Sequence, residues 1–179
     1  MTRRLFTLAY PLLSAADRAL IGAFRAEHDQ FQMHVVEPHF TFVFGTTGVR
    51  EDVYFKHVRR IAAASAAVTF HCRYAMLGAD DSDVTAYVFL VPDEGNSALS
   101  LLHDQLYTGP LVSYLRLDLP YVPHITIGTL SDREKAKRLC DELNARGLSI
   151  AGKIESLTVA AMADNKVQDL RSFALGSDA

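Results

Sequence analysis

The sequence predicts an α+β fold built from two copies of one unit, and three observations support this prediction. The pentapeptide Pro38–Phe42 (Pro-His-Phe-Thr-Phe) returns at Pro123–Ile127 as Pro-His-Ile-Thr-Ile. Each copy lies in an alternating apolar run typical of a β-strand, and a helical pattern and then a hairpin follow it. Polar turn residues lie 41 positions after each motif histidine, at Asp80 and Asn165. We therefore expect two lobes, each an antiparallel sheet with helices on its outer face, around a central cleft.

Size and composition indicate a single globular domain over residues 1–179. The chain has 179 residues, of which 49% are hydrophobic and 22% charged, which is ordinary for a protein that buries one core. A net charge of −3 and a pI near 6.1 argue against a general nucleic-acid coat protein, which would be basic. They allow a small nucleotide or an RNA end held in one cleft. We expect a monomer with no obligate protein partner.

The cysteines and the first residues bear on the cellular compartment. Cys72 and Cys140 are the only cysteines, and we expect two buried, reduced thiols in a cytoplasmic protein. The basic pair at residues 3–4 and the apolar run after it imitate a twin-arginine export signal. Pro11 interrupts this run and Ser14 begins a helix, so we expect no export. No run approaches the ~20 apolar residues of a membrane span.

The first half is predicted to form a strand, a helix, the motif strand, a second helix and a hairpin. Pro11 ends the first strand because proline cannot donate to a central ladder, and Ser14 is a typical helix N-cap. The first helix should bury Ala16, Leu20 and Phe24, which share one face. The predicted elements are strand Leu5–Tyr10, helix Ser14–His28, strand Met33–Gly45, helix Arg50–Ala66 with buried Tyr54, Val58, Ile61 and Ala62, and strands Val68–Ala75 and Val84–Val91 around the turn Asp80–Asp83.

The second half repeats this order after one additional helix. That helix ends before Gly109 and Pro110, and Leu111–Pro120 has no clear assignment. Gly147 occupies the position after the last helix where glycine commonly ends a helix. The predicted elements are helix Ser97–Tyr107 with Leu99, Leu102 and Leu106 apolar, strand Tyr121–Leu130, helix Ser131–Arg146 with Ala136, Leu139 and Leu143 apolar, and strands Ile154–Met162 and Lys166–Ala174 around Asp164 and Asn165.

The two motifs each place a polar pair on one face of a strand. Residues i and i+2 of a strand point the same way, so His39 lies beside Thr41 and His124 beside Thr126. The alternate residues of both motifs should point into the core: Phe40, Phe42, Ile125 and Ile127. A pseudo-two-fold axis between the halves would bring the two histidines to opposite walls of the cleft.

Two facing histidines are a natural acid–base pair, because a pKa near 6.5 allows one ring to be neutral while the other is protonated. Displacement at phosphorus needs both, and threonine hydroxyls are suited to hold the phosphate oxygens. A metal site would need three or four ligands, and each motif offers one histidine, so we expect no metal and no cofactor. No local motif supports a serine or cysteine nucleophile. The remaining alternative is that both pairs are only satisfied polar positions on strands.

The doubled motif resembles the two His-x-Thr-x signatures of the two-histidine (2H) phosphoesterase superfamily, and the resemblance covers essentially the whole chain. It implies a metal-independent phosphodiesterase that opens a 2′,3′-cyclic phosphate, or makes or breaks a 2′,5′ phosphodiester. It also implies that His39 and His124 are the acid–base pair and that Thr41 and Thr126 bind the phosphate. By analogy with this family, His124 activates the nucleophile and His39 protonates the leaving group.

The sequence departs from the family after the second motif, where many ligase-like members carry a basic residue and this chain has Gly128–Leu130 (Gly-Thr-Leu). This favours a small nucleotide over long RNA. Tyr10 and Tyr121 lie near the motif strands and are candidates for stacking on a base, with a half-buried tyrosine at a strand end as the alternative. A non-catalytic nucleotide- or RNA-binding module is the competing function, and RNA end-joining is a third that the acidic pI disfavours.

Overall fold

The computed structural model describes residues 3–29, 32–79, 85–164 and 166–176, and within these residues the strands form two antiparallel sheets. This confirms the predicted α+β class. The predicted turns Asp80–Asp83 and Asn165 lie outside the described residues. One sheet has the order β3 (Phe40–Thr46), β1 (Leu5–Ala9), β8 (Ser156–Ala163), β9 (Lys166–Ala174), and the other has the order β2 (Leu12–Leu13), β7 (Ile150–Ile154), β4 (Val68–Ala79), β5 (Ala86–Glu94), β6 (Ile125–Leu130).

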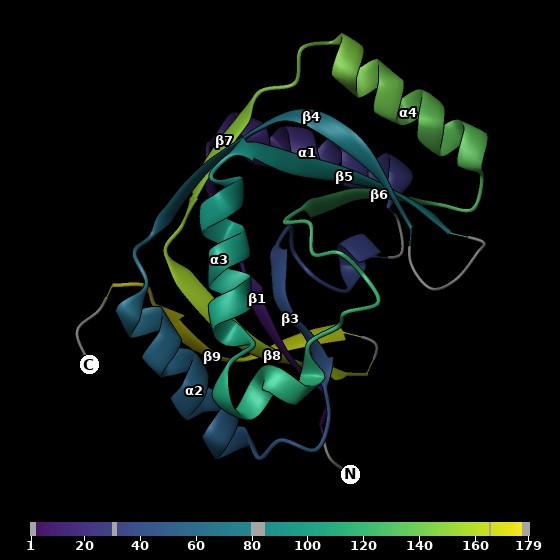
Figure 1. Cartoon of the computed structure of the whole chain (residues 1–179). Coiled ribbons are helices and arrows are strands. Elements are labelled where there is room, and N and C mark those ends of the chain that lie inside the picture. The colour runs from purple at the N-terminus through teal and green to yellow at the C-terminus, as the bar shows by residue number, and fades with distance from the viewer. Residues whose placement is uncertain (1–2, 30–31, 80–84, 165, 177–179) are drawn as a thin grey trace.

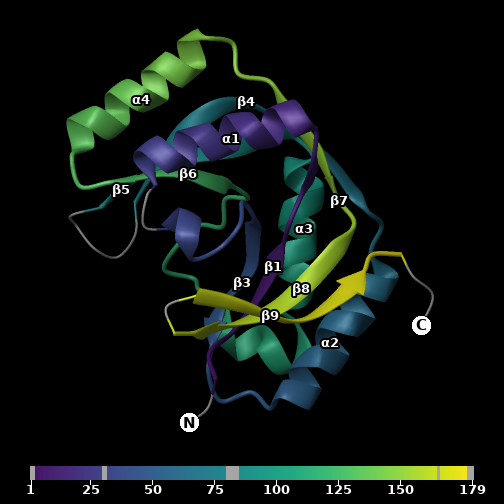
Figure 2. The ribbon, with the colours of Figure 1, turned by 180° about the vertical axis from the view of Figure 1, so that it is seen from behind.

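Helices cover the sheets, as Figures 1 and 2 show. Helix α2 (Glu51–Ala64) packs on β8 and β9, and α4 (Arg133–Ala145) packs on β4, β5 and β6. Helix α1 (Ala15–His28) lies along β6, while α3 (Asn96–Leu106) contacts strands of both sheets. Two 3₁₀ turns, η1 (Gln32–His34) and η2 (Gly109–Tyr114), precede the two motifs. No helix in these ranges is long and apolar enough to cross a membrane.

The two halves of the sequence exchange their hairpins. Motif strand β6, from the second half, pairs with β5 of the first-half hairpin. Motif strand β3, from the first half, pairs through β1 with the second-half hairpin β8–β9. Side-chain alternation predicts strands but not their partners, so the sequence did not indicate this exchange. Both motif strands therefore stand at sheet edges, with their first residues available to form a site.

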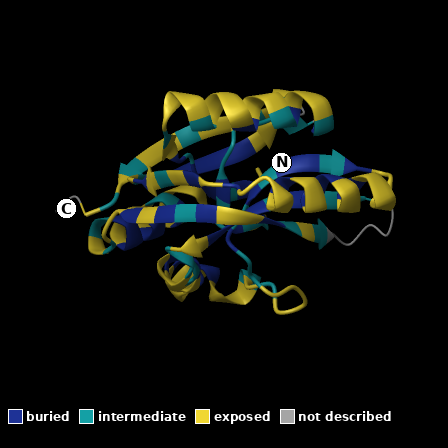
Figure 3. Cartoon of the chain, turned by 90° about the horizontal axis from the view of Figure 1, so that it is seen from above, coloured by how far each residue is buried: buried dark blue, intermediate teal, exposed yellow. Residues whose placement is uncertain are grey.

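The apolar residues of both motifs lie in the core, as predicted: Phe40, Phe42, Ile125 and Ile127 are fully buried. Figure 3 shows buried strands between helices whose outer faces are exposed. The predicted starts of the motif strands, Met33 and Tyr121, are wrong, because β3 begins at Phe40 and β6 at Ile125. Proline has no N–H to donate, so Pro38 and Pro123 stand before the ladders and each histidine lies between its proline and its strand.

Helix α1 begins as predicted but buries a different face. The Ser14 side chain accepts a hydrogen bond from the Asp17 N–H, which confirms the N-cap. The predicted stripe is wrong for Ala16 and Leu20, which are exposed, while Phe24 is partly buried against the core. The fully buried residues of the helix are Ile21 and Arg25. A charged residue lies inside because it forms an ion pair there, which a rule based on apolar spacing does not detect.

Smaller corrections concern α4 and β4. The N-cap of α4 is Asp132, whose carboxylate accepts from the Lys135 N–H, and not Ser131. Alternation along Val68–Ala75 predicts that Tyr74 shares one face with Phe70 and Cys72, but Tyr74 is 39% exposed, because the pairing with β5 shifts register near Cys72. Strands β2 and β7 were not predicted. The apolar stripes predicted for α2, α3 and α4 are buried, and Gly147 has the expected positive φ of 73°.

Candidate active site

The two motif histidines are held in the same way. The Nδ1 atom of His39 lies 2.7 Å from the main-chain carbonyl oxygen of Glu37, and Nδ1 of His124 lies 2.7 Å from that of Val122. A carbonyl oxygen can only accept, so each Nδ1 carries the proton and donates. In the neutral ring Nε2 is then an acceptor, and both histidines present the same tautomer.

A cavity of about 300 Å³ brings residues of both motifs together. His39 and Thr41 line it from β3 and the residue before it, and Thr126 lines it from β6. Helix α1 adds Arg25 to the wall, and its C-cap residue Asp29 lies beside it. His124 is close enough for its charge to lower the pKa of His39. Thr41 and Thr126, which are 85 positions apart in the sequence, therefore line one cavity, whereas His124 is not among its lining residues.

Burial sets the protonation of both rings. It lowers the pKa of His39 to about 4, against the opposing effect of the hydrogen bond to the Glu37 carbonyl, and the charges of Arg25 and His124 lower that pKa further. Burial also lowers the pKa of His124. At neutral pH both rings are therefore neutral in the empty site. A bound anion would favour protonation of either ring, because opposite charges stabilise each other at short range.

The imidazole of His124 rests on an aromatic support. It stacks on the ring of Phe89 with centroids 3.7 Å apart and planes at 23°, and Tyr87 stacks on Phe89 at 5.8 Å. Gly78 on the neighbouring strand makes room for this arrangement, because a Cβ there would overlap the Phe89 ring. The orientation of His124 thus depends on a close approach that only glycine allows.

Arg25 was not predicted as a site residue. Its Nε donates to Asp29 Oδ2 at 3.1 Å, and its Nη2 donates to the Val36 carbonyl at 2.8 Å. Asp29 Oδ1 accepts from the Thr129 hydroxyl at 2.6 Å. The network joins α1 to the segment before His39 and to the strand after His124. A signal was present, since Ile21, Arg25 and Asp29 follow one another at i, i+4 spacing.

Comparison with known proteins identifies the family. The model of the 2′-5′ RNA ligase superfamily matches residues 11–166. The chain belongs to this superfamily. The match confirms the resemblance to the 2H phosphoesterases. Membership supports a phosphodiesterase-type activity on nucleotides or RNA ends.

Solved structures with the same fold include two from other 2H phosphoesterases. E. coli LigT complexed with 3′-AMP has a TM-score of 0.60 and 18% sequence identity, over 99% of this chain and 100% of that one. Kluyveromyces marxianus Usb1 with uridine monophosphate has a TM-score of 0.56 and 9% identity, over 97% and 99%. At these identities the likeness concerns the fold. No curated protein matches the sequence.

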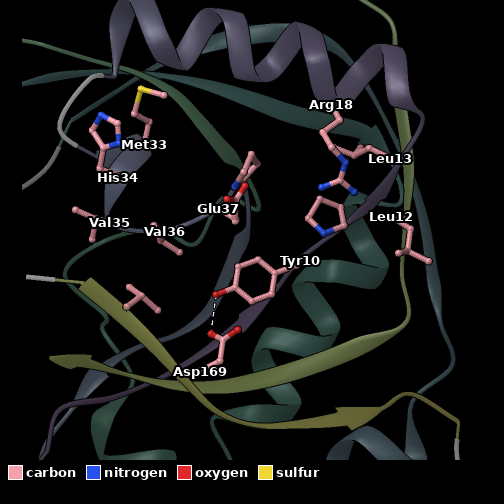
Figure 4. A pocket seen from close by; sticks show the side chains of 13 residues that line it. Tyr10, Leu12, Leu13, Arg18, Met33, His34, Val35, Val36, Glu37 and Asp169 are labelled. Atoms are coloured by element: carbon pink, nitrogen blue, oxygen red, sulfur yellow. Dashed lines mark hydrogen bonds between the residues drawn. The ribbon is translucent and has the colours of Figure 1, made fainter.

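Tyr10 and Tyr121, the two tyrosines predicted to stack on a base, have different surroundings in the structure. The Tyr121 ring stacks on His103 with centroids 3.6 Å apart, and its hydroxyl donates to the Thr41 carbonyl at 3.1 Å. The Tyr10 and His39 rings pack in a T-shaped arrangement with centroids 6.3 Å apart, and the Tyr10 hydroxyl donates to Asp169 at 2.8 Å (Figure 4). Tyr10 thus lies beside a motif histidine, whereas Tyr121 joins the approach to the second motif to the first motif strand.

The described residues contain no cluster of side chains suited to bind a metal ion. Within those ranges, no group of three or more histidine, cysteine, aspartate or glutamate side chains could hold a metal ion. The polar groups that line the His39 cavity are a histidine, two threonines, a glutamine, a tyrosine and the Arg25–Asp29 pair. These groups can exchange protons and donate hydrogen bonds, and the Arg25–Asp29 pair is neutral overall.

Proposed function

We propose that the protein is a metal-independent phosphodiesterase that opens a 2′,3′-cyclic phosphate or cleaves a 2′,5′-linked nucleotide or RNA end. The observation that carries the proposal is the matched pair of histidines. His39 and His124 each donate Nδ1–H to the carbonyl two residues earlier, so each has Nε2 left for proton transfer. A displacement at phosphorus needs one such group to accept a proton and another to give one.

The reaction divides the two roles between the histidines. His124 Nε2 takes a proton from a water molecule as the water oxygen forms a bond to phosphorus. The bond from phosphorus to the leaving ribose oxygen breaks, and that oxygen takes a proton from His39 Nε2. His39 is protonated for this step because the negative phosphodiester beside it opposes the effect of burial on its pKa. After the reaction, exchange with solvent restores both rings.

The remaining cavity groups hold the phosphate. The hydroxyls of Thr41 and Thr126 donate to its non-bridging oxygens, one from each motif, and stabilise the charge that builds up there. Arg25 lines the cavity from helix α1 with its charge balanced by Asp29, in a chain that has no basic residue directly after the second motif. The nucleotide complexes of LigT and Usb1 support a nucleotide as the ligand of this fold.

Hydrolysis of 2′,3′-cyclic mononucleotides in the presence of EDTA tests the proposal. We expect turnover to survive the chelator. It should fall about 10²–10⁴-fold in His39→Ala, and by a similar factor in the separate variant His124→Ala, since each removes one positioned proton transfer. Nucleotide binding without turnover in the wild type would instead identify a non-catalytic binding module. Activity that EDTA abolishes would contradict the two-histidine mechanism.

A further inference from the structure

Strand β3, which carries Thr41 of the first motif, lies at the edge of its sheet. In the part of the chain that the structure describes, its one strand neighbour is β1. The outward main-chain groups of an edge strand have no ladder partner, so water or side chains must satisfy them. Two residues of β3, Thr41 and Phe44, also line the cavity that contains His39. The way in which their main chain is held therefore bears on the shape of the site.

Two tyrosine hydroxyls take the place of the missing strand beside β3. The Tyr121 hydroxyl donates to the Thr41 carbonyl at 3.1 Å, and the Phe44 N–H donates to the Tyr107 hydroxyl at 3.1 Å. Burial raises the pKa of both tyrosines, so both hydroxyls keep their protons at neutral pH. The main chain of two cavity-lining residues is thus held by side chains from outside the sheet.

The His103 ring, from helix α3, holds both tyrosine rings. It stacks on the Tyr121 ring with centroids 3.6 Å apart and planes at 13°, and it contacts the Tyr107 ring with centroids 4.9 Å apart. His103 is only 4% exposed, and its Nδ1 lies 2.9 Å from a carboxylate oxygen of Asp104. One face of the Tyr121 ring is therefore covered, and its hydroxyl is engaged at the same time. A rotation of this side chain would break both contacts.

Tyr121 also belongs to the segment that leads into the second motif. The next residue, Val122, provides the carbonyl that accepts from Nδ1 of His124. The bond from Tyr121 to Thr41 joins residues 80 positions apart, and it connects the main chain that holds His124 to the main chain that carries Thr41. Because the peptide unit is planar, a fixed carbonyl constrains the backbone at Thr41 and the direction of its side chain.

We propose that Tyr121 is a positioning residue that holds the Thr41 hydroxyl in place for the phosphate. This inference rests on the proposed function, in which Thr41 donates to a non-bridging phosphate oxygen. The role depends on the tyrosine hydroxyl, whereas stacking on a base would need only the ring. Tyr121→Phe separates the two roles, because it removes the hydroxyl and keeps the ring on His103.

Steady-state kinetics of Tyr121→Phe on 2′,3′-cyclic AMP test the proposal. We expect kcat to fall about 10-fold with little change in KM, because a displacement of about 1 Å can cost about 10²-fold and the loss of one hydrogen bond allows a smaller displacement. The matched control is Tyr54→Phe, which removes the buried hydrogen bond between Tyr54 and Thr7 of β1. This control should keep wild-type kcat. Wild-type kcat in Tyr121→Phe as well would overturn the proposal.

Double-mutant cycles determine whether the effect depends on Thr41. In the Thr41→Val background, Tyr121→Phe should change kcat less than about 2-fold, because no hydroxyl remains there to be positioned. In the Thr126→Val background, Tyr121→Phe should again lower kcat about 10-fold. Equal factors in the two backgrounds would overturn the proposal, since Tyr121 would then act on another group.

An NMR measurement distinguishes this inference from the proposed function. The methyl resonance of Thr41 reports the position of its side chain without any substrate. We expect this resonance to shift in Tyr121→Phe and to stay in place in Tyr54→Phe. If the wild type hydrolyses no cyclic nucleotide, the proposed function fails, and the NMR spectra still decide whether Tyr121 positions Thr41. An unshifted Thr41 methyl resonance in Tyr121→Phe would overturn the inference in either case.

Discussion

Arg25 and Asp29 form an ion pair whose side chains are only 6% and 0% exposed, at the wall of the cavity that contains His39. The pair connects three parts of the fold, because Arg25 also binds the Val36 carbonyl and Asp29 also accepts from Thr129. Removal of one partner from such a pair leaves a buried charge without compensation, which costs more free energy than the pair itself contributes.

Arg25→Met should therefore lower the free energy of unfolding by about 3–5 kcal/mol, as measured by urea denaturation. The control is Arg50→Met, which breaks an ion pair with Asp52 in which the side chains are 78% and 65% exposed. Solvent screens that pair, so the control should lose less than about 1 kcal/mol. Similar losses of unfolding free energy in the two variants would show that the buried pair stabilises the fold no more than an exposed pair does.

Helix α1 illustrates what the sequence could not reveal. Apolar spacing placed Leu20 inside, yet the helix is rotated so that Ile21 and Arg25 face the core. The rotation is favourable only because Asp29 neutralises Arg25 and Thr129, on a strand 100 residues away, completes the network. Local periodicity carries no information about such distant partners, so the charged wall of the site was missed.

The motifs themselves were predictable for a physical reason. Alternation decides which side chains face the core, and it separated buried Phe40 from Thr41 at the cavity. The repeat also led to the prediction that the two histidines face one cleft; the two motif threonines line one cavity, and the pairing of the histidines stays a prediction. Strand partners depend on long-range pairing, so the exchange of hairpins between the halves was not visible, and the proline before each histidine shifted the true strand starts.

The stability of the protein should depend on pH through His39. Its pKa is about 4 in the folded state and about 6.5 when unfolded, so between these values the unfolded chain binds a proton that the folded chain does not. The contribution is fully present above pH 6.5 and is lost as the pH falls toward 4. We expect the free energy of unfolding to decrease over this window, and less steeply in His39→Gln. An NMR titration of the His39 ring checks the cause directly, and a midpoint near 6.5 in the folded protein would contradict it.

Thr41→Val and Thr126→Val should each lower kcat about 10²–10³-fold, with a smaller effect on KM. Valine keeps the shape of threonine and removes only the hydroxyl that donates to the phosphate in the proposed mechanism. Steady-state kinetics on a 2′,3′-cyclic nucleotide measure the effect. Thr69→Val, at an exposed position of β4, is the matched control and should retain wild-type kinetics. Full activity in both motif variants would remove the threonines from the mechanism.

Gly78 should control activity through two aromatic rings, although it lies on β4 outside both motifs. A methyl group in Gly78→Ala would overlap the ring of Phe89, which must then move, and His124 stacks on that ring at 3.7 Å. A displacement of about 1 Å in a catalytic group can cost about 10²-fold in rate, so we expect kcat to fall by about that factor. The control is Gly22→Ala in α1, where a Cβ would meet no atom within 4 Å. Alanine is the better helix former, so this variant should gain about 0.5–1 kcal/mol in stability and keep its activity. Wild-type kcat in Gly78→Ala, with the His124 ring resonances unshifted in NMR spectra, would show that the stacking does not position His124.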